Sequence, residues 1–200
     1  RLELARRGII VHPLIAGAVP GHRACVGRTL HVVLPAQRVQ PGAAPADVPA
    51  IVGLIRELAE FEKLSHLLQV TPETLHPHLF GQRPVVEAQV AQLDGEVVGF
   101  ALFFTNFSTF LSKPGLYLED LYVRPALRGR GIGEALLSRL AAIAVERGYG
   151  RFEWSELDWN SNAIRFYEKM GATVLPDWRI CRLAGEALRA VQDGHIRFLP

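Results

Sequence analysis

Hydrophobic and polar positions repeat along this chain with two periods, and the changes of period predict its elements. A short first strand is expected at residues 37–40. Apolar residues then recur at helical spacing up to Glu62, after Asp47, a favourable N-cap residue. A second, shorter helix is expected from Thr71 to Gly81, because the proline after Thr71 suits a first helical position.

The next part of the chain has the pattern of a β-hairpin. Residues 85–93 and 96–104 flank Asp94-Gly95, the strongest short-range signal for a tight hairpin turn. Residues 106–115 are polar and aromatic and contain Lys113-Pro114, so we expect a loop that forms one wall of a cleft. Residues 117–123 are aromatic and branched, as in a buried strand, and Pro125 ends that strand.

Helices and strands continue to alternate in the C-terminal half. Apolar positions from Ile132 to Ala144 lie on one helical face, and Gly148 is a plausible stop for that helix. The later elements are expected as a strand at 151–157, a helix from Asn160, a final strand at 178–183 and a short helix at 186–191.

The loop between the strand at 117–123 and the following helix has the chemistry of an anion site. Three glycines, Gly129, Gly131 and Gly133, alternate with arginines at a helix N-terminus. The first N–H groups of a helix have no internal partner and carry the positive end of its dipole, so they can hold a phosphate. A Walker A loop is excluded, because Gly133 is not followed by Lys-Ser/Thr. A dinucleotide fingerprint is excluded because its third glycine is missing.

Two motifs together carry a family resemblance. Arg128-x-x-Gly131-x-Gly133, directly after a Val-Arg-Pro strand end, resembles the coenzyme A loop of the GNAT acyltransferase superfamily. Residues 160–172 resemble the superfamily's later Asn-x-x-Ala…Tyr…Gly helix. Within the superfamily, residues 118–120, Trp159-Asn160 and 166–169 are similar to the diamine (spermidine/spermine) acetyltransferases and their bacterial relatives.

The resemblance covers about residues 37–191 and implies both a fold and a co-substrate. The fold is α/β (α+β), a mixed and mostly antiparallel central sheet flanked by helices, with a splayed strand pair that forms the coenzyme A cleft. Acetyl-CoA is the implied co-substrate, with no metal. The residues implied to bind it are Leu121, Tyr122, Val123, Arg128, Gly129, Arg130, Gly131, Ile132, Gly133, Glu134, Asn160, Ser161, Asn162 and Ala163.

The resemblance also implies direct transfer of an acetyl group to an amine, without a covalent enzyme intermediate. An ammonium with a pKa of ~10.4 must first lose a proton. Glu119 is our candidate to accept it through water, the alternative being that Glu119 only attracts the cation. Tyr167 stands where the superfamily's tyrosine protonates the departing thiolate; taken alone, a tyrosine between Phe166 and Met170 is more often a core aromatic residue than an acid.

The implied substrate is a small cation, a diamine, a polyamine or a lysine-like amino acid. Its expected binding residues are Phe61, Glu62, Glu119, Asp120, Glu153, Trp154 and Ser155. Glu156 is a further acid that could contribute if Phe152, Trp154 and Leu157 pack inward; otherwise such acids face water. Diamine enzymes bring an acid from the segment before their last strand, where this chain has only Asp177. The alternatives are a protein-lysine acetyltransferase and a non-catalytic acyl-CoA sensor.

Composition narrows the class of protein. A chain of 200 residues with 49% hydrophobic content suits one domain. Cys25 and Cys181 have no metal-ligand spacing and suit a reducing, cytoplasmic location. Residues 1–35 contain five arginines and one acid; taking these from the 22 basic and 20 acidic residues of the whole chain leaves 17 and 19. A mildly acidic body does not predict nucleic-acid binding, and no run reaches the ~20 apolar residues of a membrane span.

The two ends of the chain lie outside the resemblance. Residues 1–36 are expected to be a poorly ordered extension; a secretory signal is the alternative, but His12-Pro13 interrupts the apolar run. Residues 192–200 are expected to be a C-terminal tail. The resemblance further implies a homodimer, with the strand at 178–183 near its interface.

Overall fold

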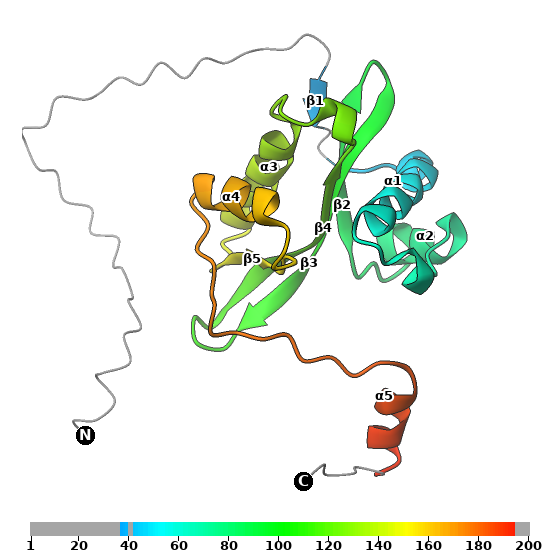
Figure 1. The fold of residues 1–200 in the computed structure, drawn as a ribbon, viewed down its shortest axis with the longest axis vertical. Helices are drawn as coiled ribbons and strands as arrows, with labels where there is room; N and C mark the ends of the chain where they lie inside the picture. The colour runs from blue at the N-terminus through cyan, green and yellow to red at the C-terminus, as the bar shows by residue number, and fades with distance from the viewer. Residues whose placement is uncertain (1–36, 40–41, 195–200) are drawn as a thin grey trace, which may run out of the picture. The chain divides into compact units, whose positions relative to one another are not determined.

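The structure is a computed structural model, and it describes residues 37–39 and 42–194 (Figure 1). The expected N-terminal extension, residues 1–36, lies outside the described residues. Within them, a five-stranded sheet has the order β1-β2-β3-β4-β5. Its strands are β1 (Gln37–Val39), β2 (Glu87–Leu93), β3 (Glu96–Ser108), β4 (Lys113–Val123) and β5 (Phe152–Trp154). Neighbours from β1 to β4 are antiparallel and β4 and β5 are parallel, which confirms a mixed, mostly antiparallel sheet.

Helices cover both faces of this sheet (Figure 1), α1 (Val48–Phe61) and α2 (Pro72–Phe80) on one and α3 (Ile132–Glu146) and α4 (Ser161–Lys169) on the other. A further helix of the described chain, α5 (Gly185–Gln192), contains no buried residue. One core cluster joins α1 and α2 to the sheet around Ile51, Leu54 and Phe100, which are each 0% exposed. A second joins α3 and α4 to the opposite face around Leu116, Leu136 and Tyr167. None of the helices in the described part of the chain is long and apolar enough to cross a bilayer.

Local sequence signals explain several element boundaries. Thr71 caps α2, its hydroxyl accepting a hydrogen bond from the Thr74 N–H at 3.3 Å. The turn between β2 and β3 places Asp94 and Gly95 at φ of 52° and 85°, the left-handed region that Asp-Gly tolerates. Asp47 stands at the N-cap of α1, but its carboxylate accepts from the Ala44 N–H instead of a helix N–H.

The expected loop at residues 106–115 is wrong. β3 continues to Ser108 and β4 begins at Lys113, with Asn106 opposite Gly115 and Phe107 opposite Pro114, so these residues extend a long hairpin. Pro114 is tolerated there because its carbonyl accepts from the Gly150 N–H, on the side away from β3. Since a strand residue's N and O point the same way, its nitrogen also faces away from β3 and no ladder bond to β3 is lost.

The expected final strand at residues 178–183 is also wrong, and the strand at 151–157 is shorter than expected. Residues 178–183 have no regular secondary structure, and Trp178 and Ile180 are 77% and 67% exposed. β5 spans Phe152–Trp154 only. Hydrophobic alternation identifies a segment able to form a strand, but a strand also needs a sheet edge beside it.

Candidate active site

A β-bulge in β4 opens the sheet at the candidate site. Leu118 pairs with Phe103 and Asp120 pairs with Leu102, so Glu119 is an extra residue in β4. Pairing between β4 and β5 covers residues 116–118 and 152–154. Within the described chain, residues 120–123 beyond the bulge therefore pair with β3 only. On their other side, β4 and β5 are no longer paired.

The bulge also changes which face each side chain occupies. Leu116 and Leu118 pack in the cluster under α3, and beyond the bulge it is Val123 that does so. Tyr122 packs instead with the residues of α1. Because side chains alternate along a strand, Asp120 shares the α1 side with Tyr122. The bulge thus brings an acid from β4 toward the end of α1.

Four acids gather around this position, and we call them the carboxylate cluster: Glu62, Glu119, Asp120 and Glu156. Burial, together with the negative charges of Glu119 and Glu62, raises the pKa of Asp120 to about 7. Burial also raises the pKa of Glu62, with Glu156 as the second cause. Clustered negative charge with a carboxyl group titrating near neutral pH can bind a cation and accept its proton.

Glu153, an expected substrate-binding residue, lies outside the carboxylate cluster. Phe152 and Trp154 pack against the α3 core, so Glu153 points to the opposite face of β5. Its carboxylate pairs with Arg151 at 3.1 Å and accepts from Asn106 Nδ2 at 2.9 Å. The structure thus gives Glu153 a partner of its own. Ser155 is also engaged, its hydroxyl lying 2.8 Å from that of Tyr117.

Tyr167 is a core residue with a polar contact. Its side chain is 8% exposed and its ring packs edge-on against Trp154, with centroids 4.9 Å apart. Burial raises the pKa of Tyr167, and the neighbouring Glu156 carboxylate raises it further through its charge and a hydrogen bond. The phenol therefore keeps its proton at neutral pH and can act as a donor.

Glu156 lies beside the cap of α4, a position that the sequence did not predict. Its Oε1 accepts from the Leu157 N–H and from Asn160 Nδ2, both at 3.0 Å. Asn160 in turn caps α4, its Oδ1 accepting from the Ala163 N–H at 3.4 Å. An acid four residues before a helix-capping asparagine was the available signal, but its nearness to Tyr167 depends on how α4 packs.

The glycine loop has the conformation that its sequence requires. Gly129 and Gly131 adopt φ of 75° and 80°, where side chains with a Cβ are strained, and the space beside each is open. Gly131 is the N-cap of α3, so the N–H groups of the first turn lie next to this open space. A Cβ on Gly133 would lie 3.8 Å from Phe166 and 4.0 Å from Val123, between α4 and β4.

Arg128 bridges the loop, β4 and the end of α1. Its Nε donates to the Val123 carbonyl at 2.9 Å, so that carbonyl, expected to be available to the coenzyme, already has a partner. Its guanidinium lies 5.1 Å from the ring centroid of Phe61 and 5.4 Å from that of Tyr122. Phe61 also contacts Trp159, with ring centroids 5.8 Å apart. Phe61 thus lies beside both the glycine loop and the segment before α4.

The remaining expected coenzyme residues lie at the two helix starts. Arg130 and Glu134 are exposed, at the loop and in the first turn of α3. Ser161 and Asn162 are exposed at the start of α4, and the Asn162 Oδ1 accepts from Arg165 Nη2 at 2.5 Å. Leu121 is half-buried against the α3 core.

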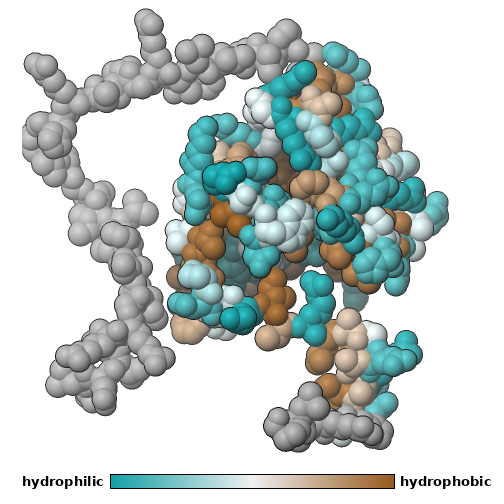
Figure 2. Space-filling view, in the orientation of Figure 1, coloured by the Kyte–Doolittle hydropathy of each residue, from teal (hydrophilic) through white to brown (hydrophobic). Residues whose placement is uncertain are grey.

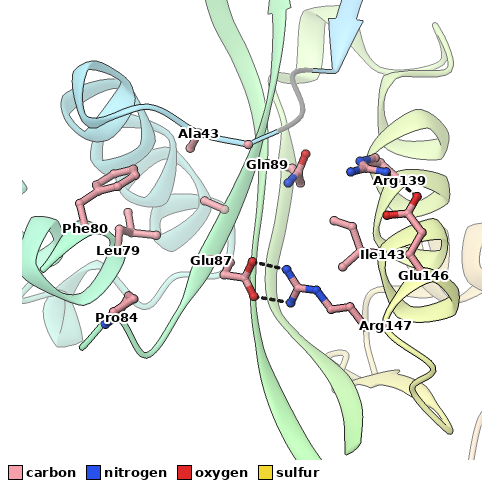
Figure 3. A pocket seen from close by; sticks show the side chains of 12 residues that line it. Ala43, Leu79, Phe80, Pro84, Glu87, Gln89, Arg139, Ile143, Glu146 and Arg147 are labelled. Carbon is pink, nitrogen blue, oxygen red and sulfur yellow. Dashed lines mark hydrogen bonds and ion pairs between the residues drawn. The ribbon is translucent and has the colours of Figure 1, made fainter. Parts of the chain in front are cut away.

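A separate hollow of about 410 Å³ lies between β2, α2 and α3 (Figure 3). Arg147 and Glu87 form a two-point ion pair across it, with N–O distances of 2.5 and 2.6 Å. Gln89 is buried there, and its Oε1 has no hydrogen-bond partner among the residues that the structure describes. The residues that line it do not include any expected site residue, so the candidate chemistry lies at the bulge.

Comparison with known proteins gives a family match and named relatives. Residues 54–172 match the family model described as the Acetyltransferase (GNAT) family. The chain is 38% identical over 199 residues to L-ornithine N5-acetyltransferase of Arabidopsis thaliana, covering 77% of this chain and 87% of the relative. It is 39% identical over 158 residues to thialysine N-epsilon-acetyltransferase of Mus musculus, covering 74% and 92%.

Solved structures share the fold. An integron cassette protein from V. cholerae matches with a TM-score of 0.66 at 24% identity, over 78% of this chain and 98% of that one. A ribosomal-protein-alanine N-acetyltransferase from Brucella melitensis matches with a TM-score of 0.58 at 23% identity, over 75% and 100%. At such identities, the likeness bears on the fold alone.

Proposed function

Because this chain belongs to the GNAT acetyltransferase family, whose members use acetyl-CoA, we propose that it acetylates the side-chain amine of a lysine-like or ornithine-like amino acid. The relatives named for L-ornithine N5 and thialysine N-epsilon act on amines of this kind. Diamines and polyamines are the second substrate class, supported by 31% identity over 73% of this chain to a spermidine/spermine N(1)-acetyltransferase-like protein of Homo sapiens.

The carboxylate cluster is the observation that supports a cationic substrate. Several carboxylates around one half-buried position attract an ammonium group, which arrives charged at neutral pH. Asp120 suits the proton acceptor, because a carboxyl group with a pKa of about 7 is a better base than an ordinary aspartate. Glu119 is exposed, and we assign it only the attraction of the cation. Its other expected role, proton acceptor, passes to Asp120.

The coenzyme is assigned to the gap beyond the bulge. The N-terminus of α3 and the glycine loop would hold the pyrophosphate of acetyl-CoA. The β5 side of residues 119–123 would hold its pantetheine arm, and an N–H there would stabilise negative charge on the thioester oxygen. Direct attack by the amine then needs both substrates bound together, and Tyr167 would protonate the departing sulfur.

We also propose a cytoplasmic homodimer. Exposed apolar side chains follow one another along residues 174–183, in the C-terminal segment where Figure 2 shows apolar surface. Such a run on a single chain is typical of a protein–protein contact, and twofold pairs are the commonest soluble assembly. The free thiol of exposed Cys181 suits a reducing compartment.

A panel of amines tests the substrate. Free thiol release from acetyl-CoA would be measured with L-ornithine, L-lysine, thialysine, putrescine, spermidine and a histone-like peptide, with L-norleucine as the control that lacks a side-chain amine. We expect the highest kcat/KM with an amino acid that carries a side-chain amine. Activity with the peptide alone would indicate a protein-lysine acetyltransferase, and no release with any amine would indicate an acyl-CoA sensor.

A further inference from the structure

The hollow between β2, α2 and α3 contains a buried polar group that lacks a partner. Gln89 of β2 is 3% exposed, and its Oε1 accepts no hydrogen bond from any residue that the structure describes. A buried carbonyl oxygen without a donor is costly, so the great majority of such groups in folded proteins are paired. A water molecule or a ligand that enters the hollow would supply the missing donor.

The alternation of side chains along β2 explains why Gln89 faces this space. Ala88 packs in the core cluster under α1 and α2, whereas Ala91 packs in the cluster under α3. Successive side chains of a strand point to opposite faces, so Gln89 lies on the α3 side with Ala91. Figure 3 shows the Gln89 amide and the Arg139 guanidinium pointing toward one another from β2 and α3.

The hollow lies at a part of the sheet edge that β1 does not reach. β1 pairs with residues 91–93 of β2, and beside residue 88 the Ala43 N–H donates to the Ala88 carbonyl at 2.9 Å. Ala43 and the buried side chain of Ile143 form apolar parts of the wall. The volume of about 410 Å³ falls within the ~300–1,000 Å³ of small-molecule sites, so the space is large enough for a small organic ligand.

The two arginines that line the hollow differ in how fully they are engaged. Arg147 bonds Glu87 at two points, at 2.5 and 2.6 Å, and its Cζ lies 5.9 Å from the ring centroid of Tyr149. Among the described residues Arg139 makes one hydrogen bond, from Nη1 to Glu146 Oε1 at 3.1 Å. Because a guanidinium has five N–H donors, Arg139 keeps donors that can bind a carboxylate.

We propose that this hollow is a second binding site, which takes a free α-amino acid with an apolar side chain. The carboxylate would bind Arg139, the ammonium would donate to Gln89 Oε1, and the side chain would lie against Ile143. A zwitterion suits the hollow because its lining contains two acids and two arginines, so an added charge of one sign would be left unpaired. The inference is independent of acetyl transfer, since it uses none of the candidate active-site residues.

Calorimetry on the full chain tests the ligand class. The probe is L-norleucine, which has no side-chain amine and so is no substrate of the proposed reaction. We expect saturable binding with a Kd of ~1 mM or lower. Hexanoate lacks the ammonium and L-norleucinamide lacks the carboxylate, so each should bind at least tenfold more weakly. Absence of saturable norleucine binding would overturn the proposal, and so would equal binding of either analogue.

Two variants of the hollow test the location. Gln89→Leu removes the amide at nearly constant size, and Arg139→Gln, at a half-exposed position, removes the charge even if the first variant fails to fold. Each should weaken norleucine binding at least tenfold. Arg56→Gln, at an exposed arginine of α1, is the control and should bind like the parent. Parent-like binding by folded Gln89→Leu and by Arg139→Gln would overturn the proposal.

An active-site variant distinguishes this inference from the proposed function. Asp120→Asn should bind norleucine like the parent, because Asp120 does not line the hollow. The Ile143 methyl resonance, identified by its loss in Ile143→Val, should shift as norleucine is added. Loss of binding in Asp120→Asn, or an unmoved Ile143 resonance, would place norleucine elsewhere and overturn the proposal. None of these measurements depends on whether any amine is acetylated.

Discussion

At the scale of single residues, Tyr167 combines packing with chemistry. It belongs to the α3 core and packs against Trp154 and Phe166, with ring centroids 4.9 and 5.3 Å apart. Yet its phenol lies beside a carboxylate that sequence alone could not place there. Its aromatic ring and its hydroxyl can therefore be tested separately.

We predict that Tyr167→Phe keeps the fold and loses activity. The ring contacts remain, so the free energy of unfolding should change by less than about 1 kcal/mol, the value of one hydrogen bond. Without a proton donor, kcat should fall ~10²–10⁴-fold while the Kd for acetyl-CoA stays nearly constant. Tyr149→Phe is the control, because it removes a hydroxyl that contacts Thr105 at 2.7 Å, outside the candidate site. A Tyr167→Phe protein within about twofold of the parent, with chemistry limiting the rate, would leave Tyr167 as a core aromatic residue only.

Asp120 leads to a prediction about pH. Its folded pKa of about 7 lies above the 3.8 of an ordinary aspartate, so between these two pH values the folded protein binds more protons here than the unfolded chain. The contribution of this group to stability is therefore largest at low pH and falls as pH rises toward 7. Activity should change oppositely, kcat/KM rising through pH 7 as the carboxylate forms.

Asp120→Asn tests both effects. We expect it to be more stable than the parent at pH 8, with the difference shrinking toward pH 4, when urea unfolding is compared across pH. It should also lose the rise of kcat/KM near pH 7 together with most of the activity. Asp158→Asn, at an exposed carboxylate, should show neither change. A parent whose kcat/KM is flat between pH 6 and 8 would contradict Asp120 as proton acceptor.

At the scale of elements, the start of α3 is the part whose sequence and geometry agree most closely. Gly131 at φ 80° cannot become valine without backbone strain, so a bulky residue there would disturb the loop as well as a ligand. Gly133 has no such restriction, and a Cβ there meets its neighbours only at ordinary contact distances.

We therefore predict that Gly133→Val weakens acetyl-CoA binding and leaves the protein folded. The added branched side chain would lie beside Phe166 and Val123, next to the α3 N-terminus that is proposed to hold the pyrophosphate and the β4 residues proposed to hold the pantetheine. Calorimetry should show a Kd at least tenfold higher, about 1.4 kcal/mol. Gly53→Val, also at a helical glycine with open space around it, should bind normally. Binding as tight as the parent's would remove the glycine loop from the coenzyme site.

At the scale of the whole molecule, the C-terminal segment supports an assembly. Val174, Leu175 and Leu183 are at least half exposed, as are Trp178 and Ile180. Burying such side chains stabilises an interface by roughly 25 cal/mol per Å² of apolar surface.

We predict a homodimer at micromolar concentration that Ile180→Glu weakens at least tenfold, because a charge would have to be buried with this segment. Sedimentation equilibrium of both proteins measures it. Val145→Glu on α3 is the control, since Val145 is 79% exposed outside the segment. A parent that sediments as a monomer would exclude the proposed assembly.

Short-range signals in the sequence were enough for the elements that depend on neighbouring residues. The Asp94-Gly95 turn, the Thr71 cap of α2 and the glycine loop before α3 follow from conformational preferences of a few consecutive residues, and the structure agrees with each. The two motifs at residues 128–133 and 160–172 were enough for the family, because they come together in one chain.

Tertiary packing decided what depends on distant residues. Residues 106–115 form a hairpin because a partner strand lies beside each half. Within the described chain, residues 178–183 do not form a strand. Side-chain alternation does not say whether a partner strand lies alongside. The bulge at Glu119 sets which face Asp120 occupies, and the packing of α1 and α4 brings the charge of Glu156 to bear on both Glu62 and Tyr167. The pKa of an acid depends on its burial and on the charges near it in space. The raised pKa values in this cluster could therefore be assigned only from the tertiary structure.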